Sequence, residues 1–270
     1  MAAVRNILVH LDDPEALTSF LPAVVQLARD LKARALTLTA VGFVEAPLTG
    51  ASMTLSLVQA RQREAEDLLE LMRQRAIRAA PDLDLEWRGA ATSRMANPAP
   101  DWSVMGDLLT LRAPEPSAGP LGRFDVGELV LTAGRPVLLV PRSATRLAFD
   151  RVLIGFKPTR EGRLALSAAL PLLQDARRVH LAAFGSTTTP WQLKDAAAFL
   201  AHHGIEAETT LREAVEDAQA GRALLDLAEA DRSDLLVTGA YGHSRTRELI
   251  FGGVTRTLLG EAPLPWLMAH

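Results

Sequence analysis

The sequence contains an internal duplication, which constrains the fold more than any other feature of the chain. The segment that starts at Asp107 corresponds to the segment that starts at Asp234, an offset of 127 residues (234 minus 107). Near the start of each copy, Ile7 corresponds to Val152, an offset of 145 residues (152 minus 7). The first copy is therefore longer by 18 residues (145 minus 127), and residues 45–57 are the expected place of the extra length. Because internal self-similarity marks repeated structural units, the chain is expected to contain two copies of one domain.

Each copy alternates short apolar runs with amphipathic segments, which predicts strands alternating with helices. The expected strands cover residues 6–11, 35–43, 83–89, 107–111, 136–140, 151–156, 178–184, 206–212, 235–237 and 264–268. The expected helices cover residues 12–32, 55–80, 97–105, 125–133, 160–173, 190–203, 221–230 and 254–260. This alternation predicts an α/β fold with two tandem doubly wound, Rossmann-like parallel-sheet domains, residues 1–145 and 146–270.

The composition of the chain limits which ligands and macromolecular partners it is expected to bind. The 270 residues carry a formal net charge of -3, which provides no electrostatic reason to bind nucleic acid or an anionic membrane. The chain has no cysteine, which excludes disulfides and thiol chemistry, and its six histidines lack a metal-ligand spacing. No apolar run approaches the roughly 20 residues of a membrane span, and the first residues lack the apolar region of a signal peptide. We therefore expect a cytoplasmic protein with neither nucleic acid nor membrane as a partner.

A glycine-rich stretch in the second copy is the strongest candidate for a binding site. Gly239 and Gly242 follow an apolar strand and leave two positions free to adopt positive φ, and Gly252 and Gly253 open a helix near Val254. A strand, a glycine loop and a helix N-terminus place unpaired backbone N–H groups around a concavity, which suits a phosphate. The alternative is that these glycines only make a tight strand-to-helix connection.

This glycine spacing, Gly-x-x-Gly, nine residues, then Gly followed by a small residue, resembles the nucleotide loop of the universal stress protein family. The similarity covers nearly the whole chain in the tandem form of that family. It implies non-enzymatic domains with ATP or another nucleotide or phosphate as the ligand, and it allows two chains to form a homodimer. It also implies that the final strands, 136–140 and 264–268, pair antiparallel and relate the halves by a pseudo-twofold.

The two copies depart from the family pattern in different ways. In the family an Asp at the end of the first strand helps to hold the nucleoside. The first copy keeps Asp12, but residues 111–116 carry prolines and a carboxylate instead of glycines, so we expect no nucleotide there and interpret Asp12 as a helix N-cap. The second copy has Lys157 in place of the Asp, a side chain that attracts an anion or extends into solvent. Gly253 replaces a Ser or Thr of the family, which removes a hydroxyl ligand.

These observations favour a non-enzymatic tandem universal stress protein, a cytoplasmic stress-response module with at most one degenerate nucleotide or anion site. The candidate binding residues lie in the C-terminal half: Gly239, Gly242, Gly252, Gly253, Val254 and Lys157. One alternative is an interaction protein that binds no small molecule, which the departures at 157 and 253 support. The other is an ATP-handling enzyme of a related α/β fold, against which stands the lack of a paired acid, base or nucleophile near the loop.

Overall fold

A computed structural model describes residues 3–44, 51–92, 99–114, 125–212, 215–216, 219–240, 253–261 and 263–270. Contacts between residues divide the chain into two units, Val4–Ala133 and Gly134–His270. The division falls before residue 145 because strand β5 (Val137–Val140), which ends the first copy of the repeat, pairs with a strand of the second unit. The domain bounds 1–145 and 146–270 follow the repeat and stay a prediction.

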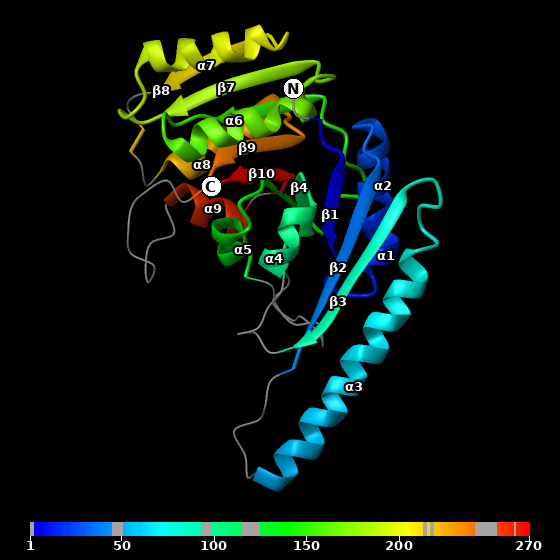
Figure 1. The fold of residues 1–270 in the computed structure, drawn as a ribbon. Coiled ribbons are helices and arrows are strands. Elements are labelled where there is room, and N and C mark those ends of the chain that lie inside the picture. The colour runs from blue at the N-terminus through cyan, green and yellow to red at the C-terminus, as the bar shows by residue number, and fades with distance from the viewer. Residues whose placement is uncertain are drawn as a thin grey trace. The chain divides into compact units, whose positions relative to one another are not determined.

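The first unit is built on parallel strands in the order β3-β2-β1-β4 (Figure 1). The strands are β1 (Asn6–His10), β2 (Ala35–Phe43), β3 (Asp84–Thr92) and β4 (Leu108–Arg112). The described helices are α1 (Ala16–Ser19), α2 (Leu21–Asp30), α3 (Ala51–Ala76), α4 (Ala99–Trp102) and α5 (Val126–Thr132), with a 3-10 turn at Ser103–Met105. Strands β1 and β4 are buried almost throughout, as continuous apolar runs in a parallel sheet should be.

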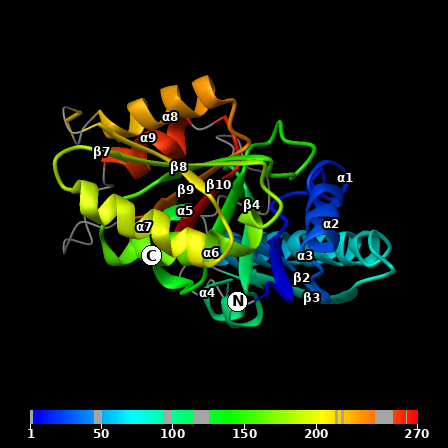
Figure 2. The same ribbon diagram turned by 90° about the horizontal axis from the view of Figure 1, so that it is seen from above.

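The second unit contains strands in the order β5-β10-β9-β6-β7-β8. Its remaining strands are β6 (Arg151–Gly155), β7 (Arg178–Phe184), β8 (Ala207–Arg212), β9 (Leu235–Gly239) and β10 (Trp266–Ala269). Its helices are α6 (Arg160–Leu173), α7 (Pro190–His202), α8 (Ala220–Asp231) and α9 (Gly253–Glu261). Helices α6 and α7 lie on one side of the strands and α8 and α9 on the other, which is the doubly wound arrangement that the sequence predicts (Figure 2).

The predicted antiparallel pairing of the two final strands is confirmed. Trp266 of β10 lies opposite Leu139 of β5, and Met268 lies opposite Val137. The other strand pairs of the second unit are parallel. Both strands are fully buried, so an apolar strand that would otherwise be an exposed edge is covered.

Two equivalent carboxylates demonstrate the repeat in three dimensions. In the first unit, one oxygen of Asp107 accepts the backbone N–H groups of residues 5 and 6, at 2.7 and 3.1 Å. In the second unit, the two oxygens of Asp234 accept the backbone N–H groups of residues 150 and 151, at 2.9 and 3.0 Å. Each Asp directly precedes a central strand and accepts hydrogen bonds from the backbone at the start of the neighbouring strand. The offset of 127 residues between them therefore joins positions with the same structural role.

The predicted helix at 12–32 is wrong in one respect, because it is interrupted. Helix α1 ends at Ser19, and α2 begins at Leu21 with a proline, Pro22, in its first turn. Proline has no N–H to donate to the preceding turn and is favoured at a helix start. Two short helices therefore follow β1, whereas the corresponding α6 runs unbroken over the predicted residues 160–173.

Candidate functional site

Two of the candidate residues, Lys157 and Gly239, lie at the carboxyl ends of two neighbouring strands. Strands β6 and β9 are paired in parallel, with Gly155 opposite Thr238. Lys157 follows β6 by two residues, and Gly239 is the last residue of β9. In parallel α/β sheets ligands bind outside this edge of the sheet. Of the other predicted residues, Gly242 and Gly252 lie outside the described residues.

Gly239 is required by close packing rather than by its backbone dihedrals. It does not adopt a positive φ, so the expected conformational role is wrong for this position. A Cβ atom there would lie 2.6 Å from the backbone N of Gly162 and 2.7 Å from the carbonyl carbon of Glu161. A Cβ on Gly162 would in turn lie 2.0 Å from the carbonyl oxygen of Lys157. The first turn of α6 is therefore pressed against the ends of β6 and β9.

Glu161 is a member of this site that the sequence reasoning missed. Its side chain is only 13% exposed and lies in the first turn of α6, where the helix dipole favours a negative charge. The N-cap of the helix is Thr159, whose hydroxyl accepts the N–H of Gly162 at 3.2 Å. An acidic residue in a first helical turn was the available signal. The carboxylate lies 3.9 Å from the Nη1 atom of the exposed Arg160, and a carboxylate here suits a hydroxyl or amino group of a ligand and disfavours a phosphate beside it.

The start of helix α9 is held against α8. Gly253 is the first residue of α9, and Val254 is half-buried. A Cβ on Gly221 of α8 would lie 3.1 Å from the Cα of Val254 and 2.9 Å from the Cβ of Thr257. A glycine in α8 thus allows the two helix backbones to approach closely. This contact fixes the first turn of α9, whose N–H groups are the predicted anion donors.

The backbone groups of Ala240, the residue after Gly239, are hydrogen-bonded to the C-terminal residues of the same chain. The N–H of Ala240 donates to the carbonyl oxygen of Ala269 at 2.9 Å, and the Nδ1 atom of His270 lies 3.1 Å from the carbonyl oxygen of Ala240. The indole N–H of the fully buried Trp266 donates to the hydroxyl of Thr238 at 2.9 Å. Trp266 is therefore a packing residue, as predicted. The backbone groups of Ala240 are therefore used within the second unit.

The corresponding position of the first unit holds an ion-paired arginine. Arg112 corresponds to Gly239 at the repeat offset (239 minus 112 is 127), and its side chain is 2% exposed. Its Nε and Nη2 atoms donate to one oxygen of Asp12 at 2.9 and 2.7 Å, and Nη2 lies 2.5 Å from Asp13. Its Nη1 atom lies 3.4 Å from the hydroxyl of Ser19. The guanidinium thus fills the space at the ends of β1 and β4.

The interpretation of Asp12 as a helix N-cap is therefore wrong. Its carboxylate pairs with Arg112, while an oxygen of Asp13 accepts the N–H of Ala16 at 2.9 Å and caps the first turn instead. A buried guanidinium needs charged acceptors more than an exposed N–H group does, because it cannot lose its charge. Within the predicted loop 111–116, residues 115 and 116 lie outside the described residues.

A buried histidine lies beside this cluster. His10, the last residue of β1, is 6% exposed, and its Nδ1 atom lies 3.3 Å from the hydroxyl of Thr39. Burial lowers the pKa of His10 to about 4, although the charge of Asp12 acts in the opposite direction. The imidazole is therefore neutral at neutral pH.

A second polar cluster ties α8 to the strands. Asp231, the last residue of α8, is hydrogen-bonded to His180 and pairs with Arg178 at 3.0 Å. The Nε2 atom of His180 lies 2.8 Å from the hydroxyl of Thr210 in β8. A carboxylate at a helix C-terminus is unfavourable, and these partners offset it. The cluster anchors the end of α8 to β7 and β8.

Two further kinds of site are not found in the described parts of the chain. No group of three or more His, Asp and Glu side chains there could hold a metal ion. No helix among the described residues has the length and apolar character needed to cross a membrane.

Comparison with known proteins identifies the class of domain. Residues 148–270 match the model of the Universal stress protein family. The structure of a universal stress protein from Archaeoglobus fulgidus DSM 4304 aligns with 98% of this chain and 95% of its own, at 17% identity and a TM-score of 0.69. A functionally unknown protein from Pseudomonas aeruginosa PAO1 aligns with 99% of this chain and 92% of its own, at 14% identity and a TM-score of 0.60. No curated protein matches the sequence.

Shorter relatives match one half of the chain. A universal stress protein solved in complex with cAMP aligns with 46% of this chain and 98% of its own, at 20% identity and a TM-score of 0.37. Residues 148–270 are thus similar to the universal stress protein family, and over its whole length the chain has the fold of the Archaeoglobus fulgidus universal stress protein.

Proposed function

We propose that this chain is a non-enzymatic, cytoplasmic stress-response protein with one nucleotide or phosphate site, in its C-terminal half. The observation that carries the proposal is the contrast between Arg112 and Gly239 at equivalent positions of the repeat. In the first unit a guanidinium and two carboxylates occupy the edge where a ligand would bind. In the second unit the same position is a glycine, and no side chain extends from it toward the ligand edge.

The proposed ligand contacts come from three places at that edge. The glycine loop with Gly242 and Gly252, and the N–H groups at Gly253 and Val254, would bind phosphate oxygens. Lys157 would add a positive charge after β6. Glu161 would accept a hydrogen bond from a ribose hydroxyl or a base amino group, which Lys157 cannot do.

Affinity should be lower than in a site with the full family pattern. The missing Asp and the missing hydroxyl at 253 remove about two hydrogen bonds, at roughly 0.5–1.5 kcal/mol each. This difference corresponds to a loss of roughly one to two orders of magnitude in the dissociation constant. Glu161 offsets part of the loss for a nucleoside and none of it for inorganic phosphate.

Calorimetric titration of the full chain with ATP, cAMP and inorganic phosphate tests the proposal. We expect heat from at least one of them, a weaker interaction in Lys157→Ala, and no interaction in Gly242→Val, whose branched side chain blocks close backbone approach. Lys194→Ala is the matched control, because it removes the same charge from helix α7, which packs against β7 and β8. Binding by the unaltered chain that Lys157→Ala and Gly242→Val both leave unchanged would place the site elsewhere.

A restoring substitution separates this proposal from the interaction-protein alternative. Lys157→Asp returns the family residue and should strengthen ATP binding while weakening that of inorganic phosphate. If none of the three compounds binds the unaltered chain or Lys157→Asp, the departures at 157 and 253 favour an interaction protein without a small ligand.

A further inference from the structure

The second unit has a strand with one unpaired edge. Strand β8 pairs with β7 and is the last strand in the order of the described strands. The N–H of Gly185 donates to the carbonyl oxygen of Arg212 at 3.0 Å, so the backbone polar groups of Arg212 point toward β7. The N–H and C=O groups of one strand residue point to the same side, and this side alternates from one residue to the next. The backbone groups of Thr209 and Leu211 therefore point away from β7, toward the open edge of the sheet. Their donors and acceptors form an open ladder.

Strand β8 carries two charged residues, Glu208 and Arg212, but lacks three other devices that usually protect such an edge. It contains neither proline nor lysine, and its register with β7 runs without a bulge from Ala207 to Arg212. Natural sheets commonly blunt free edges with these features. An edge without them is suited to pair with another strand.

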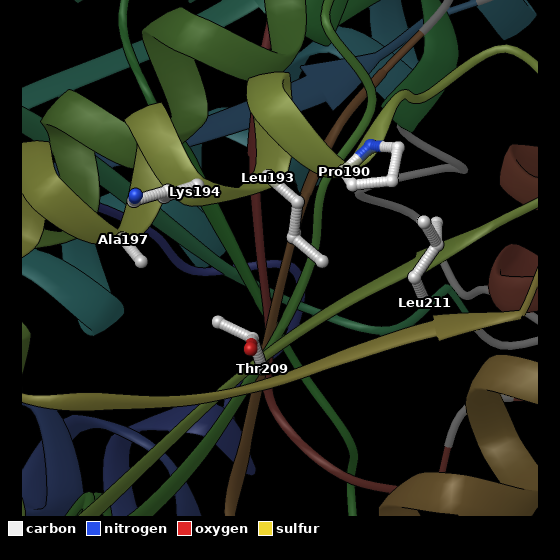
Figure 3. A pocket seen from close by; sticks show the side chains of 6 residues that line it. All are labelled: Pro190, Leu193, Lys194, Ala197, Thr209 and Leu211. Atoms are coloured by element: carbon white, nitrogen blue, oxygen red, sulfur yellow. The ribbon is translucent and has the colours of Figure 1, made fainter.

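A groove runs beside this edge, between α7 and β8 (Figure 3). Its volume is about 330 Å³, and its walls are formed by Pro190, Leu193, Lys194, Ala197, Thr209 and Leu211. The side chains of Leu193 and Thr209 point into the same space from the helix and from the strand (Figure 3). Trp191, in the first turn of α7, is 71% exposed. The edge therefore combines open backbone groups with apolar surface.

We propose that this edge pairs with the same edge of a second copy of the chain, antiparallel about a twofold axis at Thr210. Open residues must face open residues, so Thr209 lies opposite Leu211 of the second copy. The same register places Glu208 opposite Arg212 of the second copy, and the twofold creates this pair of opposite charges twice. Glu208 also binds Arg178 of its own chain at 2.7 Å, but its side chain is 60% exposed and can share its charge with a second cation. Leu211 of the second copy then lies beside Thr209, at the mouth of the groove.

Charges within the strand favour this register over its neighbour. A twofold at Thr209 would also join open residues, but it would place Glu208 opposite Thr210, and Arg212 would lie opposite Glu206, which precedes the strand. Opposite charges directly across an antiparallel pair are favourable, whereas like charges are unfavourable. The sequence of β8 is thus complementary to itself in one register. This pairing is independent of ligand binding at the ends of β6 and β9.

Charge exchange at this edge tests the pairing in the full chain. Sedimentation velocity at about 100 μM should give a dimer of two 29.1 kDa chains. Arg212→Glu places like charges opposite each other twice and should raise the dissociation constant about tenfold or more. Glu208→Arg should do the same, although it also removes the carboxylate that pairs with Arg178, and the double exchange Glu208→Arg/Arg212→Glu should restore the dimer. Only residues that face each other across the interface give such restoration.

A backbone substitution provides a second measurement. Thr209→Pro removes an outward N–H group without removing a bond to β7, and it should also weaken the dimer. Thr209→Val, which keeps the N–H, is the matched control and should leave the dimer intact. Circular dichroism melting of each variant shows that the fold is retained. A chain that is monomeric at about 100 μM, or a dimer that neither Arg212→Glu nor Thr209→Pro weakens, would overturn the proposal.

Discussion

Replacement of Arg112 by alanine should destabilise the first unit. The side chain is 2% exposed and donates to Asp12 and Asp13, so its removal leaves two carboxylates without their cation. Removing one partner of a fully buried ion pair costs about 3–5 kcal/mol. Because Asp12 and Asp13 keep 19% and 30% of their exposure, water can solvate them in part, and we expect a loss of about 2–4 kcal/mol.

Urea unfolding followed by circular dichroism and tryptophan fluorescence measures this loss. Arg29→Ala is the control in the same unit, since Arg29 and Asp82 form an ion pair at 2.7 Å whose side chains are 44% and 51% exposed. An exposed pair contributes little, so this variant should unfold like the unaltered chain. A double-mutant cycle of Arg112→Ala and Asp12→Ala should give a coupling free energy of about 1 kcal/mol or more. Equal effects of Arg112→Ala and Arg29→Ala would refute the assignment of a buried, tightly coupled cluster.

Three further predictions concern stability. The pKa of His10 is about 4 in the folded chain, whereas an ordinary histidine has a pKa of 6.5. Between these two pH values the unfolded chain therefore binds more protons than the folded chain. Stability should therefore fall by about 2 kcal/mol from pH 7 to pH 5, and His10→Gln should flatten this dependence in urea titrations. Gly239→Ala should lower the free energy of unfolding by about 1–3 kcal/mol, since its Cβ would meet backbone atoms at 2.6 Å; an unchanged melting temperature would contradict the packing described for α6. Asp234→Asn should cost about 1–3 kcal/mol, because Asp234 uses two oxygens for two N–H groups. Asp107→Asn should cost less, because one oxygen of Asp107 accepts both bonds.

The sequence by itself determined the architecture of each unit. Buried parallel strands are short continuous apolar runs, and a proline or threonine marks a helix start, so local patterns contain this information. Helix α6 and strand β7 begin and end at the predicted residues, 160–173 and 178–184. The pairing of β5 with β10 was also predictable, although from resemblance to a family and not from periodicity.

Only the tertiary structure decided which side chains meet. Arg112 and Asp12 are 100 residues apart. No local pattern indicates that the guanidinium at the end of β4 pairs with the carboxylate that follows β1, so that this carboxylate does not cap a helix. Likewise the proximity of Glu161 to Gly239 depends on how closely α6 approaches β9. Strand order and helix packing set these contacts, and both result from burial summed over the whole chain. Periodicity therefore predicts the elements, whereas the chemistry at their ends is determined by the fold.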